Sequence, residues 1–206
     1  MKRNSSLRVL AIIALICLAF GLGHVVAAGE WKVEVVSGDR STVLTGADAA
    51  AMKAHTMKAA FLRSTGRIDG PSAYTVIPMD AILARVGGIN PDQAIRVTAR
   101  DGYQMVYSFA QVNGGVFTYD DKGNALRVGG PSMLLAFESE RDSADKLPRI
   151  IYGRPDGVVI TDGHFWAKSV AKIEVIKGVE DWQISLSGSE KVWLDRATFE
   201  SIVTCP

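Results

Sequence analysis

The chain of 206 residues has only two cysteines, Cys17 and Cys205, and three histidines. Cys17 lies in an apolar N-terminal leader, so removal of that leader leaves one cysteine and no intrachain disulfide. His164 has no second histidine or cysteine nearby, which leaves no spacing typical of a zinc site. The sequence also lacks a G-x-S-x-G elbow, a Walker loop and a G-x-G-x-x-G motif. These absences argue against hydrolase, nucleoside triphosphatase and dinucleotide-binding functions.

Residues 1–28 have the form of a secretory signal peptide. Three basic residues precede an apolar run at 9–23, and Val26 and Ala28 supply the small residues that a signal peptidase requires. We expect cleavage after Ala28 or one residue earlier, and therefore a periplasmic or extracellular protein. The alternative is an uncleaved membrane anchor, because the apolar stretch approaches the roughly 20 residues that span a bilayer.

The remaining chain is close to neutral. Loss of the leader removes three basic residues and leaves 20 basic against 22 acidic residues, a net charge of −2. This balance does not favour binding to nucleic acid, and it leaves an uncleaved leader as the expected route of membrane contact. A chain of about 178 residues can bury roughly 70% of its unfolded surface, so we expect one domain stabilised by its core.

Alternation of apolar and polar residues predicts a strand-dominated α+β fold with two or three short helices. Strands that follow one another without intervening helices argue against a doubly wound parallel sheet. Trp182 begins a further segment with one or two strands, which resembles the segment that Trp31 begins. The expected elements are core strands at 31–37 and 170–176, strands at 132–139, 148–153 and 157–161, hairpins at 94–112 and 115–128, helices at 45–63 and 78–88, and a loop at 63–74.

Several short motifs occur in an order that points to one family. The stretches LLAFES, LPRIIYGRPDG and WAKSVAKIEV follow one another between residues 134 and 175. Upstream lie an alternating W-x-V-x-V strand, the element YTVIPMDAILARVGG and a DGY hairpin. Over roughly Trp31 to Lys177, this order resembles the sulfite oxidase-type oxidoreductase molybdopterin-binding domain. The resemblance implies a molybdopterin-binding-like domain at 29–178 with that family's fold.

The resemblance also accounts for the end of the chain. Some exported members of the family carry two such domains in tandem, and the tail at 179–206 resembles the start of a second copy. Two interpretations stay open: the tail belongs to a truncated or decayed tandem protein, or it has been kept as an extra strand and helical turn on a single domain.

The resemblance places the candidate cofactor-binding residues but weakens the case for a metal. The family binds molybdenum through a cysteine thiolate on the glycine loop after the first helix, where this chain reads FLRSTGRIDG and offers Ser64 or Thr65. An alcohol is a poor substitute for a thiolate ligand. The family's Arg-Asn-His phosphate-binding segment has no counterpart. Arg149 and Lys168 match the family's arginine strand and lysine strand, and two such cations can hold a phosphate or carboxylate.

We therefore expect no catalytic residue and no metal ligand, with Ser64, Thr65, Arg149 and Lys168 as the candidate cofactor-binding positions. The alternative for Arg149 and Lys168 is an ordinary surface cation beside an acid. The favoured function is a metal-free module that binds a small anion or an exported redox partner protein. The alternative function, implied by the resemblance, is a molybdopterin-dependent oxidoreductase domain.

Overall fold

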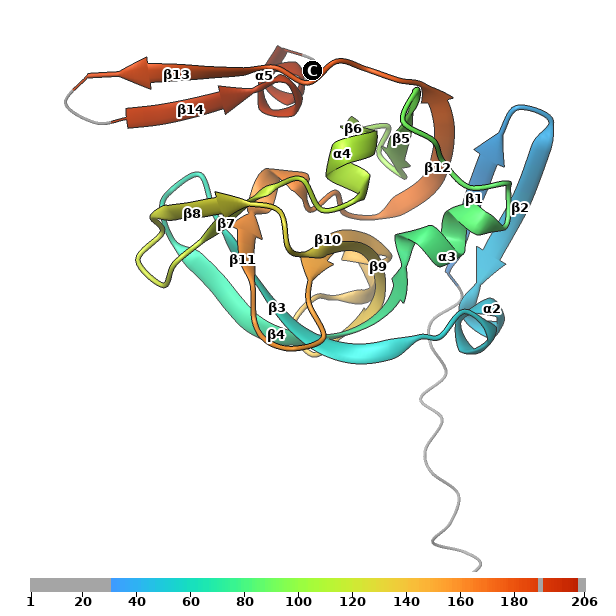
Figure 1. The fold of residues 1–206 in the computed structure, drawn as a ribbon. Coiled ribbons are helices and arrows are strands. Elements are labelled where there is room, and N and C mark those ends of the chain that lie inside the picture. The colour runs from blue at the N-terminus through green and yellow to red at the C-terminus, as the bar shows by residue number, and fades with distance from the viewer. Residues whose placement is uncertain (1–30, 189–190, 204–206) are drawn as a thin grey trace, which may run out of the picture.

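The protein was analysed as a computed structural model that describes residues 31–188 and 191–203. Two sheets form most of this part of the chain (Figure 1). The expected leader lies outside the described residues, so its cleavage stays a prediction. None of the helices within the described residues is long and apolar enough to cross a membrane.

The smaller sheet has five strands in the order β2-β1-β12-β5-β6. Strand β12 pairs in parallel with β1 and antiparallel with β5, so the two predicted core strands lie side by side at the centre. Its strands are β1 (Lys32–Ser37), β2 (Arg40–Thr45), β5 (Gln93–Ala99), β6 (Gln104–Ser108) and β12 (Val170–Lys177).

The larger sheet has seven strands in the order β10-β9-β4-β3-β11-β7-β8. Strand β3 lies near its middle, antiparallel to β4 and parallel to β11. Its strands are β3 (His55–Leu62), β4 (Ile68–Pro78), β7 (Phe117–Tyr119), β8 (Ala125–Val128), β9 (Ser132–Ser139), β10 (Arg149–Gly153) and β11 (Ile160–Asp162).

Both sheets contribute to one hydrophobic core. Val35 and Ile173 from the smaller sheet and Val76 and Leu135 from the larger sheet are fully buried members of the same cluster. Short helices close the ends of the strands: α2 (Gly46–Ala51), α3 (Met79–Ala84), α4 (Phe109–Val112), and the 3-10 turns η1 (Ala144–Lys146) and η2 (Gly163–Phe165). The strand-dominated α+β class is thus confirmed.

The helix predicted over 45–63 is present only at Gly46–Ala51, and the prediction was wrong for the residues that follow. Helix α2 ends at Ala51, and Lys53 adopts a left-handed backbone with φ of 57°. From His55 the chain is strand β3, in which Met57, Ala59 and Phe61 are buried while Lys58 is exposed. The alanines raise helix propensity, but pairing with strands on both sides decides the conformation.

The predicted loop at 63–74 was also too long. Strand β4 begins at Ile68, so the connection between β3 and β4 covers only residues 63–67. Asp69 pairs with Phe61 and Ile68 with Leu62 across the two strands. The remaining predicted strands and hairpins, and the short helix after Pro78, are confirmed in position within a few residues, except that the hairpin predicted over 94–112 ends at Ser108 and helix α4 follows.

The tail folds as a hairpin of β13 (Gln183–Ser187) and β14 (Lys191–Asp195) followed by α5 (Arg196–Val203). This is the same order of elements as β1, β2 and α2 at the start of the domain. Figure 1 shows the hairpin projecting from the two sheets, with α5 at its base. Arg196 joins the tail to the domain by donating to the Val106 carbonyl at 3.1 Å and to Gln111 Oε1 at 3.4 Å. The tandem origin of the tail stays a prediction.

Candidate functional site

The predicted cofactor loop is a tight turn between β3 and β4. The Arg63 N–H donates to the Arg67 carbonyl at 2.8 Å, and the Gly66 N–H donates to the Arg63 carbonyl at 2.9 Å. Gly66 has a φ of +79°, which an L-residue would adopt only with strain. Ser64 and Thr65 occupy the exposed tip of this turn. These two residues are therefore exposed to solvent where two interior strands of the larger sheet end.

A buried carboxylate lies directly after this turn and collects three arginines. The Asp69 side chain is only 2% exposed. It accepts a hydrogen bond from Arg63 Nε and forms ion pairs with Arg141 Nη2 at 2.9 Å and Arg67 Nη2 at 3.2 Å. Three positive charges therefore meet one negative charge, which leaves an excess of +2. We call Arg63, Arg67, Arg141 and Asp69 the arginine cluster.

The arginines keep Asp69 ionised despite its burial. Burial on its own would raise the pKa of the Asp69 carboxyl, but hydrogen bonds from Arg141 and Arg63 outweigh it and hold that pKa below its ordinary value. The same contact with Asp69 raises the pKa of Arg141. The cluster thus has a fixed anion at its centre and cations around it.

The cations surround an aromatic ring as well as a carboxylate. The guanidinium carbons of Arg63, Arg141 and Arg149 lie 6.0, 5.5 and 5.5 Å from the ring centroid of Phe61. Phe61 packs in turn against Trp166, with centroids 4.7 Å apart. Cations within about 6 Å of an aromatic face are attracted to it. The three guanidiniums therefore pack around the Phe61 ring, and this contact restricts their positions.

Arg149 has a different environment from the one that the sequence suggested. Its side chain is 2% exposed and pairs with Asp142 at 2.5 Å, while its Nη2 donates to the Trp166 carbonyl at 3.3 Å. Its guanidinium also lies 5.2 Å from the Trp166 ring centroid. The charge of Arg149 is therefore neutralised by Asp142 in the interior. Its guanidinium packs against Phe61 and Trp166 and does not face solvent.

Lys168 lies in positively charged surroundings. It is exposed on the segment between η2 and β12, and no carboxylate among the described residues lies within ion-pair distance of its amine. Partial burial of the amine, and then the neighbouring charges of Arg149 and Lys146, lower the pKa of Lys168. The charge of Asp142 acts in the opposite direction, and the charge of Arg63 lowers the pKa further. Lys168, Arg149 and the β3–β4 turn thus belong to one region.

The sequence singled out the turn but not the residues that give it charge. Arg63 and Arg67 flank Ser64 and Thr65 in the same loop, so their positions were an available signal. Arg141 carried no such signal, because it follows β9 and reaches Asp69 only through the pairing of β4 with β9.

The side chains here do not fit a thiolate-ligated molybdenum ion. Both cysteines fall outside the described residues, and the turn offers only the hydroxyls of Ser64 and Thr65. Within the described part of the chain, no group of three or more histidines, cysteines or carboxylates is arranged to hold a metal ion. A hydroxyl stays protonated near neutral pH and is a poor ligand for a soft metal.

Comparisons with protein-family models and with curated proteins supply no relative. No protein-family model matches the chain, and no curated protein matches it either. What the site binds therefore has to be inferred from its own chemistry.

Proposed function

We propose that this protein is an exported binding module for a small inorganic or carboxylate anion, held by Arg63, Arg67 and Arg141. The observation that carries the proposal is the convergence of these three guanidiniums on the single carboxylate of Asp69. Arginine is the residue best suited to such a ligand, because its planar fork of N–H donors matches carboxylate and phosphate oxygens.

The arginines have donors left over for a ligand. Their side chains are 47%, 72% and 30% exposed, in the order Arg63, Arg67 and Arg141, so solvent reaches all three. Each guanidinium has five N–H donors, and one carboxylate can accept from only part of this set. A tetrahedral oxyanion or a carboxylate of matching size would satisfy the remaining donors and neutralise the excess charge.

The other candidate residues have supporting roles in this proposal. Lys168 adds a long-range positive charge, while Arg149, paired with Asp142, positions Phe61 and Trp166. Ser64 and Thr65 lie between Arg63 and Arg67 and offer hydroxyl donors to a bound oxyanion. The anion would thus contact the turn residues and the arginine cluster together.

The order of motifs supports a scaffold derived from the sulfite oxidase-type molybdopterin-binding domain, and the leader supports export. The replacement of the cysteine position by Ser64 or Thr65 favours loss of the metal. Elemental analysis of protein purified from its native compartment separates this proposal from the oxidoreductase alternative. We expect no molybdenum, and a stoichiometric amount would overturn the proposal.

Isothermal titration with sulfate, phosphate and acetate tests the proposed ligand. Each arginine that contacts an anion contributes about 1.5–3 kcal/mol, so the Arg141→Gln variant should bind the preferred anion at least about tenfold more weakly. The Arg96→Gln variant is the matched control, because Arg96 pairs with Glu174 on the smaller sheet. Equal binding by wild type and Arg141→Gln would contradict the proposal.

A further inference from the structure

A pocket opens at the opposite end of strand β3 from the arginine cluster. Its volume is 260 Å³, and its walls come from the starts of β3 and β9 and the ends of β4 and β10. His55 and Met57 of β3 line it, whereas Phe61 lies at the other end of that strand. At about 3.3 Å per residue, the pocket and the arginine cluster are roughly 20 Å apart. They are separate sites.

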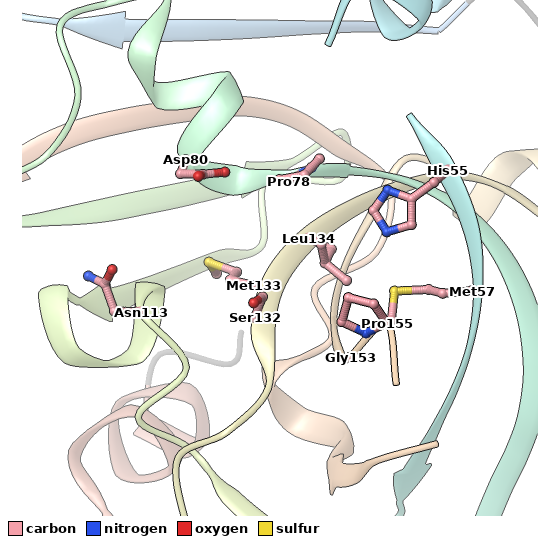
Figure 2. A pocket seen from close by; sticks show the side chains of 10 residues that line it. All are labelled: His55, Met57, Pro78, Asp80, Asn113, Ser132, Met133, Leu134, Gly153 and Pro155. Atoms are coloured by element: carbon pink, nitrogen blue, oxygen red, sulfur yellow. The ribbon is translucent and has the colours of Figure 1, made fainter. Parts of the chain in front are cut away.

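The inner wall of the pocket is apolar and contains sulfur. Met57, Met133 and Leu134 are buried there, and Figure 2 shows Leu134 between Met133 on one side and Met57 on the other. Gly153 makes the arrangement possible, since a Cβ at this position would lie 2.6 Å from Met57 Cε. Thioether groups are polarizable and make favourable contacts with aromatic rings. This wall therefore suits a flat aromatic group.

Two acceptors lie on the rim. Figure 2 shows the Asp80 carboxylate on the Met133 side of the pocket and the His55 imidazole on the Met57 side, with Pro78 between them. Asp80 Oδ1 accepts from the Ala81 N–H at 2.7 Å, and no cation among the described residues lies within ion-pair distance of this carboxylate. His55 Nδ1 lies 3.2 Å from the Lys53 carbonyl, an acceptor, so a neutral ring has its hydrogen on Nδ1 and an acceptor at Nε2.

We infer that this pocket binds a small aromatic amine, with the ring against Met133 and Leu134 and the ammonium group at Asp80. An ammonium group has three N–H donors and matches a rim that presents acceptors and a negative charge. The size also fits: benzene is held by a cavity of about 150 Å³, so 260 Å³ accommodates a ring with a short aminoalkyl chain. This inference does not depend on the proposed anion site.

Three probes of matched shape test the inference on the full chain: phenethylamine, the neutral 2-phenylethanol and the anionic 3-phenylpropanoate. Isothermal titration should give saturable binding in the order amine, alcohol, carboxylate. Methyl NMR signals of Met133 and Leu134 should shift on addition of the amine. Absence of binding, or equal affinity for the three probes, would overturn the inference.

Variants locate the binding site. The Asp80→Asn variant keeps the acceptor for the Ala81 N–H and should lower amine affinity about threefold to fivefold, as expected for an exposed ion pair, without changing alcohol affinity. Asp121→Asn is the control, because Asp121 is an exposed aspartate in the β7–β8 turn. Ser132→Phe changes an exposed lining residue and should abolish binding of both ligands by filling the pocket. Unchanged amine binding in Ser132→Phe, or an equal loss in Asp121→Asn, would overturn the inference.

Discussion

Arg141 Nη2 and Asp69 Oδ2 lie 2.9 Å apart, although Arg141 follows strand β9 and Asp69 belongs to β4. These strands are antiparallel neighbours in which Ser139 pairs with Tyr74. Continuing past Ser139 therefore carries the chain along β4 toward Asp69. Asp69 itself pairs with Phe61 on β3, so three adjacent strands determine the arginine cluster.

Replacement of Asp69 by asparagine should affect stability and binding in opposite directions. The Asp69→Asn variant loses its charged hydrogen bonds with Arg63 and Arg141, which should lower the free energy of unfolding by about 1–3 kcal/mol. It also removes the anion that competes with a ligand, so sulfate should bind several-fold more tightly. Denaturant unfolding and isothermal titration measure the two effects. Weaker sulfate binding by a folded Asp69→Asn protein would contradict the proposed site.

Acid should destabilise the protein through the same carboxylate. The pKa of Asp69 is lower in the folded protein than the ordinary value of 3.8. Its contribution to stability is therefore fully present above pH 3.8 and is lost as the pH falls below that value through the folded pKa. Unfolding experiments on wild type and Asp69→Asn between pH 2 and pH 6 should show a smaller difference in stability at the acid end. A difference that stayed constant over this range would contradict the pKa assignment.

Lys168 should contribute less than the arginines do. Its amine acts on the ligand mainly through its charge, so the Lys168→Ala variant should weaken sulfate binding by about twofold to fivefold, consistent with an exposed charge at some distance. The loss should shrink as salt is added, because screening weakens such interactions. Lys58→Ala on β3 is the control, since Lys58 is an exposed lysine toward the other end of that strand. Equal binding by Lys168→Ala and wild type would make Lys168 an ordinary surface residue.

The core at the centre of the smaller sheet predicts a large loss of stability on insertion of a charge. Val175 on β12 is 8% exposed and pairs with Ser37 on β1. The Val175→Asp variant would bury an unpaired carboxylate, which should cost about 3–5 kcal/mol and prevent folding of a marginally stable chain. Val43→Asp on β2 is the matched control, because Val43 is 54% exposed and should tolerate the change. Circular dichroism and thermal melts distinguish the two; equally stable variants would contradict this core.

The sequence predicted the strands whose alternation matches their burial. Strand β1 was predicted at 31–37 and found at Lys32–Ser37, with Val33 and Val35 buried and Lys32 and Glu34 exposed in alternation. The sequence-based prediction failed at β3, because the alanines and lysines of this segment favour a helix locally. Pairing with β4 and β11 makes the segment a strand instead. Propensity within a short window does not include such long-range pairing.

The proposed anion site includes the turn that the sequence singled out, but its arginine cluster was not predicted. The resemblance pointed to the turn at Ser64 and Thr65 and to Arg149 and Lys168. The burial of Arg149 against Asp142 and the approach of Arg141 to Asp69 depend on which strands are neighbours and in what register. A single sequence gives neither, so the arginine cluster became visible only in the folded structure.

The central claim is that Arg63, Arg67 and Arg141 bind a small anion together, and NMR of the arginine side-chain N–H groups tests it most directly. During a sulfate titration of the protein, the Nε–H signals of these three residues should shift along one saturable curve with a common dissociation constant. The Nε–H signal of Arg96, which pairs with Glu174 elsewhere, should not move. Shifts that grow linearly with sulfate for all arginines alike, without saturation, would contradict the account.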